Sequence, residues 1–338
     1  MKKYGVALIG CGHMGEAHLE HIYMKENIDL VCVCDINKSL GEFFAKKYGA
    51  KSVETDAKTV IERDDVDVVI ISTYPSTHLE LLKMCVENNK HVICEKPITD
   101  NLKDGAEFVR VVKENPQIKV LVGHILRHNE TYKKVADMIK NGAIGHPVIM
   151  RMTQNHHTMD WNRYLKLICE TSPLIDCGVH YFDVMRWFTG AEFVSVSGIG
   201  MATESDVPKG KNNYEIATVK MSDGSVGFYE AGWTKSITSS NLKEFTGPLG
   251  SIRLVYQKDR LNHSEEGDLI EYYSVETKEY KEINVQGQRK PTDVQFDQLV
   301  DMIENGASAF PSIDDVYKSF CAVFAAEEAI LNGTIKSI

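Results

Sequence analysis

The apolar positions in the first third of the chain form short continuous runs, and helical patterns separate them. The apolar runs predict strands at residues 4–9, 30–34, 66–72, 91–94 and 119–123. Patterns with a 3.6-residue period predict intervening helices that end near residue 25, cover 57–63, end near 89 and cover 102–114. Continuous runs of β-branched residues are typical of parallel strands buried on both faces. The alternation therefore predicts a doubly wound α/β unit over residues 1–124.

After residue 124 the pattern changes, and strands become more frequent than helices. Helices are predicted at 130–141, 173–189, 292–305 and 313–331, and strands at 147–153, 193–201, 214–221 and 225–233, with further strands to about 285. Asp223-Gly224 is a hairpin-turn sequence between two of these strands. Residues 125–338 are therefore predicted to form an α+β domain with a mainly antiparallel sheet.

The first predicted strand runs into Gly10-Cys11-Gly12-His13-Met14-Gly15, and a helix follows. This G-x-G-x-x-G, placed between a strand and a helix, is the phosphate-binding motif of a Rossmann domain. Gly10 permits the tight turn, Gly12 lets a pyrophosphate approach the backbone, and Gly15 lets the helix pack on the strand. The helix N-terminus then faces the phosphates of a dinucleotide.

The next strand ends at Asp35, twenty residues after the last glycine of the motif. A carboxylate at this position accepts hydrogen bonds from the adenosine ribose and repels a 2′-phosphate. Like charges about 4 Å apart repel by about 4 kcal/mol at an effective dielectric constant near 20. We therefore expect NAD as the cofactor. NADP remains possible because Lys38 follows closely.

Two stretches carry candidate acid–base chemistry. Glu95-Lys96-Pro97 follows the strand at 91–94, and ligands of open parallel sheets bind at such carboxyl ends. In the helix at 173–189, Asp176, His180 and Asp183 share one stripe. We expect Lys96 to meet this stripe beside a nicotinamide. His180, with an ordinary pKa near 6.5, is the candidate base, and Lys96 is the cation that stabilises a developing alkoxide.

Plainer interpretations exist for each of these residues. In these interpretations Lys96 only forms an ion pair with Glu95, His180 is a core histidine whose ring is hydrogen-bonded within the protein, and Asp183 has a structural role. A polar-aromatic stretch contributes further candidates, interpreted as a substrate-side loop with an ordinary surface loop as the alternative; these are Asn155, His157, Trp161 and Arg163. His156-His157 and the pair His124 and His128 raise the question of a zinc site, but the cysteines do not cluster, so no metal is predicted.

Composition sets outer limits on function. The chain has 338 residues and a formal net charge of −10, which argues against a nucleic-acid-binding protein. No apolar run approaches the roughly 20 residues that a membrane span needs. The eight cysteines form no C-x-x-C pair, and no signal peptide precedes the first strand. We therefore expect a cytoplasmic protein with reduced thiols.

Together these motifs resemble the glucose–fructose oxidoreductase / inositol dehydrogenase / MocA (Gfo/Idh/MocA) family of NAD(P)-dependent oxidoreductases. Nearly the whole chain takes part, through Gly10–Gly15, Asp35, Thr73-Tyr74-Pro75 with His78, Glu95-Lys96-Pro97, and Asp176–His180 with Asp183. The resemblance implies a Rossmann domain followed by an open antiparallel sheet that commonly builds a homodimer or homotetramer. It implies a sugar, polyol or glycoside alcohol as the hydride donor.

Residue roles also follow from the resemblance. Lys96 polarises the substrate hydroxyl, Asp176 tunes the cluster and His180 is the general base; Lys96-Pro97 is often a cis peptide in the family. The cofactor residues are Gly10, Gly12, His13, Met14, Gly15, Asp35, Thr73, Tyr74, Pro75, His78, Glu95, Lys96 and Pro97. The substrate residues are Lys96, Arg127, Asn155, His157, Trp161, Asp176 and His180.

The chain departs from the family pattern at two places. Residues 170–175 replace a stretch that is often glycine-rich, and His124 and His128 flank Arg127 where the family often has Asn or Phe. Two other functions stay open. One is NAD-dependent glycoside cleavage by transient oxidation and elimination, and the other is a nucleotide-binding regulator without turnover.

Overall fold

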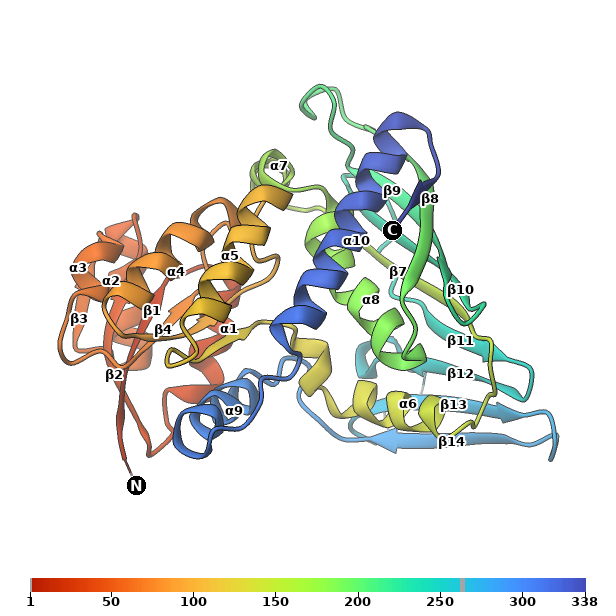
Figure 1. The fold of residues 1–338 in the computed structure, drawn as a ribbon, viewed down its shortest axis with the longest axis horizontal. Helices are drawn as coiled ribbons and strands as arrows, with labels where there is room; N and C mark the ends of the chain where they lie inside the picture. Colours follow the sequence, from red (N-terminus) through yellow and green to blue (C-terminus); the bar gives the residue numbers. More distant parts are fainter. Residues whose placement is uncertain (1, 262–264) are drawn as a thin grey trace. The chain divides into compact units, whose positions relative to one another are not determined.

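The computed structural model describes residues 2–261 and 265–338 and divides the chain into two compact units (Figure 1). Unit 1 comprises Met1–Ile125 and Lys290–Tyr317, and unit 2 comprises Leu126–Arg289 and Lys318–Ile338. The sequence-based division had placed residues 290–317 in the second domain. In the structure this segment packs with unit 1, because its helix contacts the first helix of the chain.

Unit 1 contains a six-stranded parallel sheet with strand order β3-β2-β1-β4-β5-β6. Its strands are β1 (Tyr4–Ile9), β2 (Ile28–Cys34), β3 (Ser52–Glu54), β4 (Val68–Ile71), β5 (His91–Cys94) and β6 (Val120–Val122). Every residue of β1 and β4 is buried, as expected for central parallel strands. The order reverses at β1, so the loops after β1, β2 and β4 are neighbours at one edge.

Helices alternate with these strands along the chain, and one more helix comes from the segment 290–317. They are α1 (His13–Ile22), α2 (Lys38–Tyr48), α3 (Ala57–Ile61), η1 (Pro75–Thr77), α4 (His78–Glu87), α5 (Leu102–Glu114) and α9 (Thr292–Asn305). The sequence analysis had predicted no element between residues 35 and 57, where α2 and β3 lie. Asn37 caps α2 and Gly49 ends it in the left-handed conformation, so the signals for this helix were present in the sequence.

Unit 2 contains a nine-stranded sheet with strand order β14-β13-β12-β11-β7-β10-β9-β8-β15. The strands are β7 (Ile149–His157), β8 (Phe193–Met201), β9 (Tyr214–Met221), β10 (Val226–Thr234), β11 (Lys243–Gly247), β12 (Gly250–Val255), β13 (Asp268–Ser274), β14 (Tyr280–Val285) and β15 (Lys336–Ser337). The pair β7 and β10 is parallel, and the other pairs are antiparallel. The predicted fold class, a Rossmann sheet followed by a mainly antiparallel sheet, is confirmed.

Helices cover one face of this second sheet (Figure 1). They are α6 (Glu130–Lys140), α7 (Trp161–Glu170), α8 (Pro173–Thr189) and the part of α10 (Ile313–Asn332) that begins at Lys318. The structure also has two short helices, η2 (Ile125–His128) and η3 (Gln257–Asp259). Helix α8 contacts β7, β9 and β10 and carries much of the apolar core. Its bounds agree with the prediction: Ser172 caps it, Pro173 begins it and Gly190 ends it with φ +69°.

The prediction of a loop over residues 155–163 is wrong, because this segment contains the end of β7 and the start of α7. Strand β7 continues to His157 because β10 pairs with it as far as Thr234. Helix α7 then begins at Trp161, where the Asp160 side chain accepts a hydrogen bond from the Arg163 N–H at 3.2 Å. The apolar side chains of Trp161, Tyr164, Leu167 and Ile168 turn to the core, which gives this segment a helical period.

Candidate active site

The glycine motif forms the turn that a dinucleotide needs. Gly10 has φ +97°, and a Cβ there would lie 2.6 Å from the Ser72 carbonyl oxygen. A Cβ at Gly15 would lie 2.1 Å from the Gly10 carbonyl oxygen, so only glycine lets α1 start here. Gly12 is exposed, and a Cβ there would meet nothing within 4 Å. Since Gly12 is the N-cap of α1 and has no side chain, the helix amides remain open to a pyrophosphate.

Asp35, the predicted ribose ligand, directly follows β2 and contacts the glycine turn. Its Oδ2 accepts a hydrogen bond from the Cys11 N–H at 2.9 Å, and its Oδ1 accepts one from the Asn37 N–H at 2.8 Å. These two bonds fix the orientation of the half-buried carboxylate beside the glycine turn, and each oxygen keeps a lone pair for a ribose hydroxyl. The residues of the loop after β1 and the end of β2 therefore fit NAD.

His78 connects two strand-end loops of unit 1. It is fully buried, with Nε2 3.1 Å from the Thr73 carbonyl oxygen and Nδ1 3.0 Å from the Pro97 carbonyl oxygen. Burial lowers the pKa of His78, and the two carbonyls oppose this shift. His78, a predicted cofactor residue, thus lies behind these two loops and not on their surface. Tyr74, in the loop after β4, is 42% exposed.

At the carboxyl end of β5, the adjacent charged residues Glu95 and Lys96 differ in burial. Glu95 is buried, and its Oε1 lies 2.8 Å from Nε2 of the fully buried His18. Burial raises the pKa of Glu95, but the His18 hydrogen bond and the charges of His18 and Lys96 outweigh it, so the net pKa is lowered. Lys96 is half-buried and precedes a cis peptide bond to Pro97. His18 was missed by the sequence analysis because 77 positions separate it from Glu95.

In unit 2 the predicted stripe of α8 divides by burial. From Pro173 to Phe188 every residue of the helix is buried except Asp176 and His180, which are half-buried. Asp183 is only 1% exposed, and its two oxygens accept hydrogen bonds from Nε and Nη2 of Arg127, both at 2.8 Å. Thus Asp176 and His180 reach the surface from one side of the helix, whereas Asp183 lies in a buried ion pair.

The other predicted substrate residues lie on β7 and α7. The Asn155 amide is buried and donates hydrogen bonds to Glu230 Oε1 at 2.6 Å and Ser240 Oγ at 3.1 Å. His157 is exposed at the end of β7. The Trp161 indole donates to Asp206 Oδ2 at 2.7 Å. These contacts do not join the three residues into one cluster.

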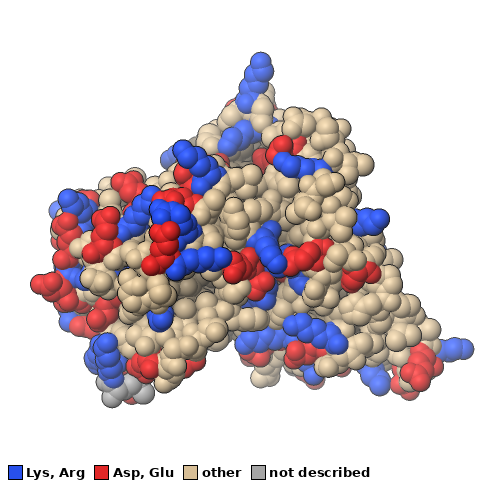
Figure 2. All heavy atoms as spheres, in the orientation of Figure 1, with Lys and Arg blue, Asp and Glu red and all other residues tan. Residues whose placement is uncertain are grey.

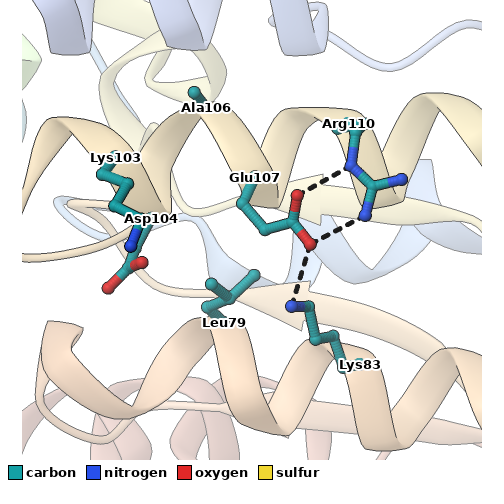
Figure 3. Close-up of a pocket in the computed structure, with 7 residues that line it drawn as sticks. All are labelled: Leu79, Lys83, Lys103, Asp104, Ala106, Glu107 and Arg110. Atoms are coloured by element: carbon teal, nitrogen blue, oxygen red, sulfur yellow. Dashed lines mark hydrogen bonds and ion pairs between the residues drawn. The ribbon is translucent and has the colours of Figure 1, made fainter.

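Charge and cavity shape give little further guidance. Basic and acidic side chains are interspersed over α4 and α5 (Figure 2). A hollow between these helices is lined by Leu79, Lys83, Lys103, Asp104, Ala106, Glu107 and Arg110, and an ion-pair network of Lys83, Glu107 and Arg110 crosses it (Figure 3). No predicted cofactor or substrate residue lines this hollow, so we assign it no chemistry.

Two searches of the described part of the chain were negative. Among residues 2–261 and 265–338, no group of three or more His, Cys, Asp or Glu side chains is arranged to hold a metal ion. No helix within these ranges has both the length and the apolar character needed to cross a membrane.

Comparison with known proteins agrees with these features. The profile "Oxidoreductase family, NAD-binding Rossmann fold" matches residues 4–124, and the "GFO/IDH/MocA C-terminal domain" matches residues 132–253. The chain belongs to the Gfo/Idh/MocA family of oxidoreductases. Family membership confirms the predicted resemblance, the predicted oxidoreductase class and the predicted cofactor NAD.

Several relatives carry names that include a substrate. The chain is 26% identical to myo-inositol 2-dehydrogenase of Thermotoga maritima over 66% of both proteins, and 29% identical to scyllo-inositol 2-dehydrogenase (NAD(+)) of Bacillus subtilis over 73% of this chain and 72% of the relative. The matched stretch thus spans about two thirds of the Thermotoga relative's length.

Solved structures share the fold over the full chain. One is myo-inositol 2-dehydrogenase from Lactobacillus plantarum, with a TM-score of 0.84, 21% identity and 100% coverage of both chains. Another is scyllo-inositol dehydrogenase from Lactobacillus casei with bound cofactor NAD(H) and scyllo-inositol, with a TM-score of 0.80, 21% identity and 99% coverage of both chains.

Proposed function

We propose that this protein is an NAD-dependent dehydrogenase that oxidises a secondary alcohol of a sugar or cyclic polyol, inositol-like compounds first among them. The main support is the exposure pattern of α8, where Asp176 and His180 are the half-buried residues of an otherwise buried stretch from Pro173 to Phe188. An acid and a base four residues apart on one side of a core helix, both partly open to solvent, can contact the same ligand. The inositol dehydrogenases to which the chain is similar support the substrate class.

Each proposed role follows from ordinary side-chain chemistry. The nicotinamide of bound NAD supplies the hydride acceptor. His180 takes the hydroxyl proton as general base, a role that typically contributes about 10²- to 10⁴-fold. The Lys96 ammonium stabilises negative charge on the alcohol oxygen as that proton leaves. Asp176 stabilises the protonated form of His180 through its negative charge.

The remaining substrate contacts are assigned by exposure. His157 and Trp161 are the candidates at the end of β7 and the start of α7, with Asn155 holding the strand end through Glu230 and Ser240. Arg127 is a less direct candidate, because its Nε and Nη2 both bind Asp183. We assign Arg127 to supporting α8 through this ion pair.

A substrate panel tests the proposed reaction. Inositols, sugars, linear polyols and glycosides are incubated with NAD, and reduced nicotinamide is followed by absorbance while products are identified by chromatography. We expect one class of free polyol to yield NADH and ketone in equal amounts. Glycoside cleavage without net NADH would instead support the elimination reaction. Absence of any turnover across the panel, with NAD binding intact, would favour a regulatory nucleotide-binding protein.

We also propose that the outer face of the nine-stranded sheet builds a homodimer or homotetramer. Apolar side chains are exposed on its strands, namely Ile149, Val194, Ile199, Met201 and Val226. Exposed apolar patches of this kind mark protein–protein contacts. Light scattering of wild type and of Ile199→Glu distinguishes an oligomer, which this change weakens, from a monomer, which it leaves unaltered.

A further inference from the structure

The segment that returns from unit 2 to unit 1 places a lysine on the phosphate-binding turn. The Lys290 ammonium lies 2.7 Å from Nε2 of His13 and 3.6 Å from Sδ of Met14. His13 and Met14 are the two variable residues between the second and third glycines of the motif. A residue 275 positions after Gly15 therefore lies against the start of α1, within unit 1.

Specific contacts hold Lys290 in this place. Thr292 is fully buried, and its hydroxyl donates a hydrogen bond to the Ala17 carbonyl oxygen at 2.8 Å, while His21 Nδ1 lies 2.9 Å from the same hydroxyl oxygen. The Thr292 N–H donates to the Lys290 carbonyl oxygen at 2.8 Å. Thr292, two residues after Lys290, thus holds the backbone against the side of α1. The Lys290 side chain extends from there toward the start of the helix.

A cation at this location is electrostatically unusual. The N-terminus of α1 carries the positive end of the helix dipole and unpaired N–H groups, so it repels cations and attracts anions. In the contact with His13 the lysine can only donate, so Nε2 of His13 accepts and that nitrogen carries no proton. His13 therefore orients the ammonium and adds no second positive charge. An anion bound between the helix amides and Lys290 is attracted by both, and this attraction outweighs the repulsion between the two positive groups.

We propose that Lys290 is a phosphate-binding residue of the NAD site, with its ammonium paired to the cofactor pyrophosphate over the N-terminus of α1. His13 is the positioning residue that accepts a hydrogen bond from it. Both matched family profiles end before Lys290, at residues 124 and 253, so neither covers it. The proposal depends on NAD binding and is independent of the substrate.

Calorimetric titration of the full chain with NAD and with ADP-ribose tests the proposal. Both ligands contain the pyrophosphate, and ADP-ribose lacks the nicotinamide. Lys290→Met is expected to weaken both by a similar factor of about ten or more, and to reduce the dependence of Kd on salt, because one ion pair to a phosphate is lost. Lys25→Met is the matched control. It removes a lysine that follows the end of α1 and is paired with Asp297 at 2.8 Å, and it is expected to leave both Kd values unchanged.

Two further variants separate binding from folding. Lys290→Arg keeps the charge and should retain most of the affinity. His13→Gln keeps an acceptor and should bind NAD more tightly than His13→Ala. Thermal unfolding without ligand checks that the variants fold. The proposal is overturned if Lys290→Met binds both ligands within twofold of wild type with an unchanged salt dependence, or if only NAD is weakened and ADP-ribose is not.

Discussion

The end of β5 in unit 1 and the middle of α8 in unit 2 are built alike. Each places a half-buried reactive side chain close in sequence to a buried carboxylate that already has a partner. Lys96 follows Glu95, which binds His18, and His180 precedes Asp183, which binds Arg127. Burial, rather than residue type, thus separates groups available to a ligand from groups that stabilise the fold.

The two buried pairs differ in their partners, and this difference has consequences for pH. Arginine is charged at every accessible pH, whereas histidine changes charge between pH 5 and 8. The pKa of Glu95 is lowered only because the His18 hydrogen bond and nearby positive charge outweigh burial. Its contribution to stability is therefore present above its ordinary pKa and disappears as the pH falls below it.

The largest expected effect concerns the half-buried residues of the two regions, Lys96 and His180. His180→Ala and Lys96→Met should each lower turnover by about 10²-fold or more, since each removes a group that acts on the alcohol oxygen or its proton. The Kd for NAD should stay within a few fold of wild type. Steady-state kinetics and calorimetry measure the two quantities. The exposed His146→Ala serves as control, and wild-type turnover in either variant would remove that residue from the mechanism.

The next effect concerns the buried pair under α8. Arg127→Met should lower the free energy of unfolding by about 3–5 kcal/mol, because it leaves the Asp183 charge buried without its guanidinium. Urea denaturation measures this loss. The matched control is Arg110→Met, which breaks exposed contacts to Glu107 (Figure 3) and should cost about 1 kcal/mol or less. Equal losses of unfolding free energy in the two variants would contradict the inference that the buried ion pair stabilises the fold more than the exposed one.

A third carboxylate sharpens the comparison because its pKa moves in the opposite direction to that of Glu95. Burial raises the pKa of Glu215 to about 8, and the neighbouring Glu327, which accepts a hydrogen bond from the Ser172 cap of α8 at 2.6 Å, adds to the rise. An acid with a raised pKa stabilises the fold below its ordinary pKa, and this contribution is lost as the pH rises through about 8.

The wild-type protein should therefore lose stability as the pH rises from 6 to 9, and Glu215→Gln should reduce this loss by about 1–2 kcal/mol. Urea denaturation across this range measures the effect, and the exposed Glu130→Gln is the control. If Glu215→Gln loses stability with rising pH as steeply as wild type, the carboxyl group is ionised in the folded protein at neutral pH and the assignment fails.

The smallest expected effect concerns Asp35, which is half-buried like Asp176 and lies beside the glycine turn. Asp35→Ala should reduce the preference for NAD over NADP about tenfold to a hundredfold, because the repulsion of a 2′-phosphate is lost and solvent already screens part of it. Calorimetric Kd values for both cofactors measure the ratio. Asp29→Ala, at the other end of β2, is the control, and an unchanged ratio in Asp35→Ala would refute the role.

The sequence alone determined the local features. The bounds of α8 follow from Ser172, Pro173 and Gly190, and the nucleotide turn follows from Gly10, Gly12 and Gly15. Capping, turn geometry and apolar period depend on neighbours within a few residues, so they can be inferred without a fold. The same local signals at Asn37 and Gly49 were sufficient for α2, which was overlooked.

Only the tertiary structure decided which charged residues are buried. Asp176, His180 and Asp183 form one stripe in sequence, yet Asp183 alone lies under the guanidinium of Arg127, 56 positions away. Glu95 likewise meets His18, and His13 meets Lys290, across 77 and 277 positions. The environment of a charge is set by elements that pack on it from distant parts of the chain, and no local pattern of residues encodes those contacts.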